Sequence, residues 1–172
     1  MATVHDDVPA PPVPAIGGGW VLRPAAEPVG SPVHAASRTR AFAASLDGGP
    51  EIALRIHHVL RHPLRACYPF GAHDLAVDLD LPEPSPPGPT PAPDPASALL
   101  RELVPALFAA TPDCRRVIAA PDEHDTRAQD VLKAGGFRRI TEADLPDRSV
   151  VLFAAEPPGI AGLSTALDDM PH

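Results

Sequence analysis

Several residue types and segment types are scarce in this chain of 172 residues, and each scarcity argues against a class of protein. No apolar run approaches the ~20 residues that span a bilayer, and the N-terminus lacks the basic and apolar regions of a secretory signal. The two cysteines, Cys67 and Cys114, match no metal-binding spacing and no redox motif. We interpret both as reduced, buried thiols, and the whole pattern predicts a cytoplasmic protein without a membrane span.

The net charge bears on the kind of partner, and the proline content bears on which segments are ordered. The formal net charge of -8 disfavours a nucleic-acid partner, because phosphate backbones repel an acidic surface. Lysine occurs once among the 14 basic residues, which we attribute to genomic composition. The 25 prolines cluster in a few segments. They predict a disordered tail over residues 1–19, a single domain over 20–155 interrupted by a proline-rich loop at 82–95, and a flexible tail over 156–172.

Hydrophobic periodicity predicts strands and helices in alternation. Strict alternation over 73–81 is typical of a strand with one apolar and one polar face. Strands are also predicted at 20–24, 51–60 and 117–120, with a continuation of the second at 64–68. Helical turns are predicted at 38–46, and helices at 96–110 and from about 126 to 134. The turn at 47–50 joins two strands, and segments 137–140 and 150–154 form a hairpin.

The segment 115–153 carries the motifs that relate the chain to a known family. It contains Pro121-Asp122 after a short strand, then a helix that ends in Ala134-Gly135-Gly136-Phe137, and Leu145-Pro146 before the last strand. This order resembles the second half of the GNAT acyltransferase fold. The branch that it resembles most acylates lysine and hydroxylysine in siderophore biosynthesis. Three positions depart from the branch's pattern: Ala120 replaces a glutamate, His124 an arginine and Asp125 an asparagine.

The resemblance implies a fold and an activity. The fold would be a single GNAT-like α/β (α+β) domain with a mixed, mostly antiparallel sheet flanked by helices. The activity would move an acetyl or acyl group from acetyl-CoA, another acyl-CoA or an acyl carrier protein to the amine of a small lysine- or hydroxylysine-type molecule. The alternative is a degenerate, non-catalytic GNAT-like module that binds a metabolite or a partner protein.

Three residues are candidates for the chemistry that the resemblance implies. Asp122 keeps the branch's aspartate after proline, at the end of a strand where ligands gather in α/β sheets. Asp78 falls where the branch has a histidine, and the two carboxylates would share a proton. His124 is a candidate replacement for the missing base. The alternatives are a helix cap for Asp122, a solvated strand face for Asp78 and an exposed loop position for His124.

The donor thioester would be held by main-chain groups. Backbone atoms at Leu79 and Leu81, and at the helix start formed by Ala96, Ser97 and Ala98, are predicted to bind the coenzyme, because free N–H groups and the helix dipole favour a pyrophosphate. The family's glycine-rich turn is missing there, and Asp94 would repel a phosphate. No metal site is predicted: His57 and His58 are adjacent on a strand, so they point to opposite faces, and His62 completes no site with them.

Overall fold

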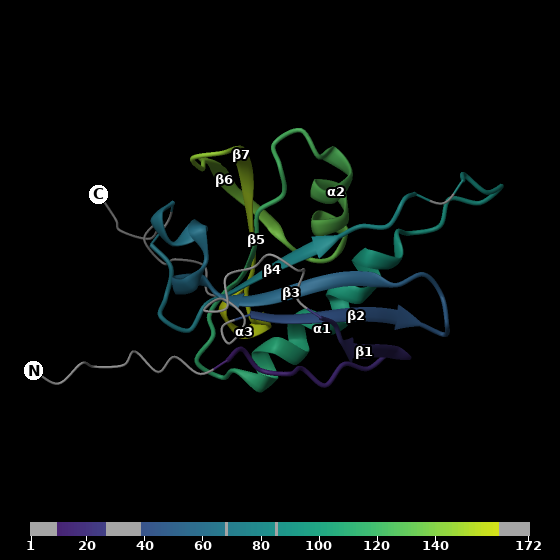
Figure 1. Ribbon diagram of the computed structural model, residues 1–172, viewed down its shortest axis with the longest axis horizontal. Helices are drawn as coiled ribbons and strands as arrows, with labels where there is room; N and C mark the ends of the chain where they lie inside the picture. The colour runs from purple at the N-terminus through teal and green to yellow at the C-terminus, as the bar shows by residue number, and fades with distance from the viewer. Residues whose placement is uncertain (1–9, 27–38, 68, 85, 162–172) are drawn as a thin grey trace, which may run out of the picture.

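The computed structural model describes residues 10–26, 39–67, 69–84 and 86–161, and a seven-stranded sheet organises them (Figure 1). The strand order is β1-β2-β3-β4-β5-β7-β6. Six strands and three helices follow β1 (Trp20–Pro24): β2 (Thr39–Leu46), β3 (Ile52–His58), β4 (Leu75–Asp80), α1 (Pro95–Ala110), β5 (Val117–Ala119), α2 (Thr126–Ala134), β6 (Arg138–Asp144), β7 (Ser149–Ala155) and α3 (Pro158–Ala161). Among the strands of the described residues, only β4 and β5 pair in parallel, which confirms the predicted mixed, mostly antiparallel sheet.

The helical turns predicted at 38–46 are wrong. Residues 39–46 form β2, which pairs with β1 on one side and β3 on the other. Phe42 and Ala44 are buried at a spacing of two residues, which fits a pleated strand. Alanine favours helices, but this local preference is weak beside the hydrogen bonds to two neighbouring strands. Position 38 lies outside the described residues.

The predicted strand continuation at 64–68 is also wrong. Two short 3-10 helices, η2 (Val59–Arg61) and η3 (Pro63–Ala66), follow β3 instead. Pro63 stands at the first position of η3, where its fixed φ suits a helical turn and no backbone donor is needed. Tyr68, the last residue of the predicted strand, lies outside the described residues. As a result, the chain doubles back over one face of the sheet at His62.

Two apolar clusters pack on the two faces of the sheet. The larger one joins alternate residues of β3 and β4, such as Ile56 and Val77, to the apolar face of α1 and to Val131 and Leu132 of α2. The smaller one joins Val59, Leu64 and Ala76 to residues of β5 and β7. Asp94 caps α1 by accepting a hydrogen bond from the Ala96 N–H at 3.0 Å.

The ends of the chain are partly held against this domain. Pro11 and Pro14 are buried and Ile16 packs against the larger cluster, so the predicted disorder does not extend over these residues. At the other end, Glu156 approaches Arg116 at 3.4 Å and Arg138 at 3.9 Å, so the predicted flexible tail does not begin there. The remaining parts of both predicted tails, 1–9 and 162–172, lie outside the described residues. Within the part of the chain that is described, no helix has the length and apolar character to cross a bilayer.

Candidate functional site

The parallel strands β4 and β5 separate from each other toward their carboxyl ends (Figure 1). Their ladder consists of only two pairs, Leu75 with Val117 and Ala76 with Ile118. Beyond these pairs β4 continues to Asp80, whereas β5 ends at Ala119 and is followed by Ala120 and Pro121, a residue without a backbone donor. A cavity of about 250 Å³ lies where the strands part. We call it the β4/β5 cavity.

The β4/β5 cavity brings together four of the predicted site residues. Asp78, Leu79 and Leu81 line it from the β4 side, and Asp122 lines it from the β5 side. Two arginines that sequence reasoning missed, Arg55 and Arg148, also line it, together with Asp80 and Asp125. No recognised motif includes either arginine: Arg55 lies on β3, outside the segment 115–153, and Arg148 lies in the β6–β7 turn, two residues after Leu145-Pro146.

The other predicted site residues lie elsewhere. The side chain of His124 is 87% exposed, stands 3.3 Å from the Glu123 carboxylate, and does not line the cavity. Ala96 and Ser97 are buried in the first turn of α1, and Ala98 packs partly against the core; none of the three lines the cavity. His124 therefore occupies an exposed loop position, which was the alternative to its prediction as a base.

Asp122 begins the connection from β5 to α2. Its Oδ1 accepts a hydrogen bond from the His124 N–H at 2.9 Å, and its backbone forms an isolated bridge to Val150 of β7. The residue that caps α2 is Asp125, which accepts from the Ala128 N–H at 3.0 Å. The helix-cap alternative for Asp122 is therefore wrong, and its carboxylate is fixed at the cavity wall by a turn.

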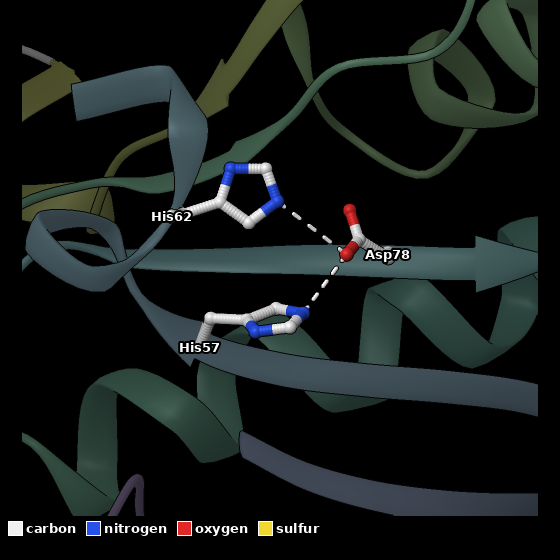
Figure 2. A group of neighbouring side chains, drawn as sticks. All are labelled: His57, His62 and Asp78. Atoms are coloured by element: carbon white, nitrogen blue, oxygen red, sulfur yellow. Dashed lines mark hydrogen bonds and ion pairs between the residues drawn. The ribbon is translucent and has the colours of Figure 1, made fainter. Parts of the chain in front are cut away.

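Asp78 is surrounded by histidines rather than by a second carboxylate (Figure 2). Its Oδ2 lies 2.9 Å from Nε2 of His57 and 3.5 Å from Nε2 of His62. Burial alone would raise the pKa of Asp78, but the hydrogen bonds of the two imidazoles, together with their positive charge when they are protonated, outweigh it and hold the pKa well below its usual range. Among the described residues the carboxylate of Asp78 contacts these imidazoles and not Asp122, so the sharing of a proton between the two carboxylates stays a prediction.

The histidines themselves are residues that sequence reasoning dismissed. The argument that His57 and His58 face opposite sides holds, because His57 faces Asp78 while His58 continues the row of Ile52, Leu54 and Ile56. His62 returns to the face of His57, because η2 turns the chain back and His62 follows η2 directly. One ligand atom from each of His57, His62 and Asp78 lies within 4.8 Å of the others, so this trio is a candidate metal centre by distance.

The start of α1, where the coenzyme pyrophosphate was expected, holds a carboxylate of the chain. Asp94 Oδ1 accepts from the Ala96 N–H, and its backbone oxygen accepts from the Ser97 N–H at 3.0 Å. Asp94 Oδ2 accepts from Nε and Nη2 of Arg127 at 3.3 and 3.0 Å, and Nη1 of Arg127 donates to the Pro82 carbonyl at 2.6 Å. Two of the three phosphate donors predicted at the start of α1, the N–H groups of Ala96 and Ser97, are thus engaged internally.

Comparison with other proteins places this geometry in a family. A protein-family model described as the acetyltransferase (GNAT) domain matches residues 18–145. The chain is 22% identical to lysine N-acyltransferase MbtK of Mycobacterium sp. (strain MCS) over 90% of its own length and 75% of the relative. It is 37% identical to MbtK of Mycolicibacterium paratuberculosis over 60 residues, which span 35% of this chain and only 27% of that relative.

Solved structures show the same fold. An uncharacterised protein of Bacillus halodurans superposes with a TM-score of 0.59 at 24% identity, covering 69% of this chain and 59% of that one. The aminoglycoside acetyltransferase AAC(6')-Ib in complex with coenzyme A and kanamycin superposes with a TM-score of 0.58 at 20% identity, covering 72% and 70%. Because the family model spans most of the chain and the sheet opens between β4 and β5, the chain belongs to the GNAT acetyltransferase family.

Proposed function

We propose that this chain transfers an acyl group from a coenzyme A thioester to a primary amine of a small molecule. The observation that carries the proposal is the β4/β5 cavity in a chain of the GNAT family, with Leu79, Leu81 and the carboxylates of Asp78 and Asp122 in its lining. The structure of AAC(6')-Ib contains coenzyme A and kanamycin, and the MbtK relatives are named lysine N-acyltransferases. Both names support an amine as the acceptor.

The reaction needs positioning and the removal of one proton. The amine nitrogen attacks the thioester carbonyl carbon, the C–N bond forms, the C–S bond breaks, and the coenzyme leaves as a thiol that takes up the proton lost by the amine. Beyond Ala76 no ladder joins β4 to β5 in the described chain. In the proposal, the main chain at Leu79 and Leu81 uses this free edge to hold the pantetheine arm of the donor.

The carboxylates at the cavity end have separate roles in the proposal. Asp122 orients the attacking amine and accepts its proton, because it lies at the carboxyl end of β5 on a fixed turn. Asp78 assists from the opposite wall. His124 has no part, since its side chain lies in solvent outside the cavity.

The acceptor that we propose is a lysine- or hydroxylysine-type amine, with a role in siderophore biosynthesis. The support is the likeness to the MbtK relatives, which is strongest over a segment of about 60 residues. The donor is an acyl-CoA or an acyl carrier protein with the same pantetheine arm.

One observation favours a second function, a non-catalytic binding module. Asp94 places a negative charge at the α1 N-terminus and engages Arg127, so a coenzyme pyrophosphate must displace it or bind elsewhere. In this alternative the β4/β5 cavity binds a metabolite and no acyl transfer follows.

Thermal unfolding and turnover separate the two functions. Acetyl-CoA at about 100 times its Kd is expected to stabilise the fold by about 2.7 kcal/mol and to raise the melting temperature. Release of free thiol with lysine, hydroxylysine or kanamycin as acceptor would show transfer. Asp122→Asn is expected to lower kcat by about 10²-fold or more, whereas the control Asp113→Asn, an exposed residue before β5, leaves it unchanged. Absence of both stabilisation and thiol release would refute the enzyme.

The charge at α1 has its own test. Asp94→Ser keeps a capping oxygen and removes the charge. If the pyrophosphate binds at α1, this change is expected to tighten acetyl-CoA binding by about fivefold, which corresponds to about 1 kcal/mol for a charge at a helix end. Unchanged affinity would mean that the donor's phosphates bind away from α1.

A further inference from the structure

Three polar side chains meet on the face of the sheet that α1 does not cover (Figure 2). His57 comes from β3, Asp78 from β4, and His62 from the connection between η2 and η3. The side chains are 16%, 31% and 9% exposed, respectively. The three side chains come from separate segments and are mostly buried. Their neighbours therefore restrict how each imidazole ring can be oriented and protonated.

Backbone hydrogen bonding decides which nitrogen of His62 carries the proton. The Leu64 N–H donates to Nδ1 of His62 at 3.3 Å, so Nδ1 presents a lone pair and the ring proton is on Nε2. Nε2 is the atom that faces Asp78. A metal-bound imidazole requires the opposite arrangement, with the lone pair toward the metal and the other ring N–H donating outward. The local backbone therefore favours a hydrogen-bonded network over a metal centre.

His57 fits the same network. Its Nε2 lies 2.9 Å from Asp78 Oδ2, and its Nδ1 lies 3.0 Å from the Thr39 hydroxyl. A hydroxyl can donate as well as accept, so Thr39 can donate to Nδ1 and leave the ring proton on Nε2. Both imidazoles then donate to one oxygen of Asp78.

The second oxygen of Asp78 is left for another partner. Neither imidazole contact involves Oδ1, which Figure 2 shows on the side away from His57, and Asp78 lines the β4/β5 cavity while the two histidines do not. The carboxylate of Asp78 thus contacts the imidazoles of His57 and His62 through one oxygen and borders the β4/β5 cavity. The charged groups that share this space come from every neighbouring element: Arg55 of β3, Asp80 of β4, Asp122 and Asp125 before α2, and Arg148 of the β6–β7 turn.

We propose that Asp78 binds the primary ammonium group of the acceptor through Oδ1, and that His57 and His62 are positioning residues that orient its carboxylate. The proposal rests on the proposed function and deepens it, because it makes the acceptor a cation. Two imidazole donors keep the carboxylate charged, as its lowered pKa indicates, so it is a good anchor and a poor base. Asp122 then takes the first proton of the ammonium group and passes it to solvent, which frees the nitrogen lone pair for attack; the second proton, lost as the amide forms, goes to the thiolate of the leaving coenzyme.

Steady-state kinetics test the anchor. Asp78→Asn is expected to raise KM for the amine by about tenfold or more, because one charge-assisted contact is lost, and to leave KM for acyl-CoA within about twofold. Equal changes in both KM values would overturn the assignment to the acceptor. The exposed His73→Ala serves as the matched histidine control.

Carbon-13 NMR of the aspartate carboxyls tests the network without turnover. In the wild-type protein the Asp78 signal is expected to stay that of a carboxylate from pH 8 down to about 4. In His57→Ala/His62→Ala burial acts alone, so the signal is expected to titrate above ~3.9, the usual value. His57→Gln keeps a donor at the same distance along the side chain and is expected to restore part of the wild-type behaviour. Circular dichroism checks the fold of each variant.

The outcomes distinguish this inference from the proposed function. If no amine is acylated but kanamycin or lysine shifts the Asp78 carboxyl signal, the anchor stands and the acyl transfer fails. If transfer occurs and the double variant does not titrate between pH 4 and 8, the positioning role fails. Stoichiometric retention of Zn²⁺ after dialysis, lost in His57→Ala, would replace the network with a metal centre.

Discussion

Substitution of Asp74 by alanine is expected to destabilise the fold strongly. The Asp74 side chain is buried, with 2% of the residue exposed, at the start of β4. Its Oδ2 accepts from the Gly71 N–H at 2.8 Å, and its Oδ1 accepts from the Arg115 and Arg116 N–H groups at 3.2 and 3.0 Å. It fastens β4 to the start of β5 at the end opposite the β4/β5 cavity.

The magnitude follows from these three contacts. A hydrogen bond to a charged group contributes about 1.5–3 kcal/mol, and the N–H groups of the exposed residues Gly71 and Arg115 can bond to water once the carboxylate is removed. Because the three contacts share one carboxylate and are not additive, we expect a total loss of about 4 kcal/mol. That is a large fraction of the ~5–15 kcal/mol that stabilises a typical domain.

Urea unfolding followed by the fluorescence of Trp20 measures this loss. Trp20 is the only tryptophan and is 7% exposed, so unfolding changes its environment. With a slope of about 2 kcal/mol per M, the midpoint is expected to fall by about 2 M at constant slope. Asp74→Asn keeps an acceptor oxygen, so its urea midpoint should lie between those of the wild type and of Asp74→Ala. The control Asp80→Ala loses only an exposed pair with Arg55 at 3.6 Å, worth at most about 1 kcal/mol. A loss below about 1 kcal/mol for Asp74→Ala would refute the reasoning.

Two further predictions concern packing and thiol chemistry. Gly135→Ala places a Cβ 2.8 Å from Leu100 Cβ and Cδ1, so it should lower the free energy of unfolding by about 1–3 kcal/mol, whereas Gly159→Ala, which meets open space, should change it little. Burial, followed by the charge of a nearby aspartate, raises the pKa of Cys114 to about 11. A disulfide reagent at pH 8 should therefore modify Cys67 in the native protein and Cys114 only after unfolding; equal rates would contradict this.

Local chemistry made several elements predictable from the sequence. The alternation over 73–81 places Leu75 and Val77 on the core face and Asp78 on the other, as the structure has them. The Asp125 cap and the glycine end of α2 follow from the cost of free N–H groups and of a left-handed residue, since Gly136 has a φ of 96°. Such preferences act within a few residues, so they can be recognised without knowing the fold.

The same alternation places Asp74 on the polar face of the strand and so predicts that it is exposed, whereas it is buried. Its burial is possible only because Arg115 and Arg116, about forty residues later, bring backbone donors to it. Residues 39–46 show a similar limit, because pairing with two strands decided their conformation. The burial of Asp74 and the strand conformation of 39–46 both depend on hydrogen-bond partners that are remote in sequence.

The sequence by itself determined the family, the order of the elements from 73 to 154, and Asp122 and Asp78 as candidate residues, because motif spacing and periodicity record local constraints. Only the tertiary structure decided what surrounds them. It brought His62 over the sheet to join His57 at Asp78, brought Arg127 to Asp94 at the start of α1, and left His124 in solvent. The physical reason is that hydrogen bonds and charges depend on distances of a few ångströms between side chains, and the path of the backbone sets those distances.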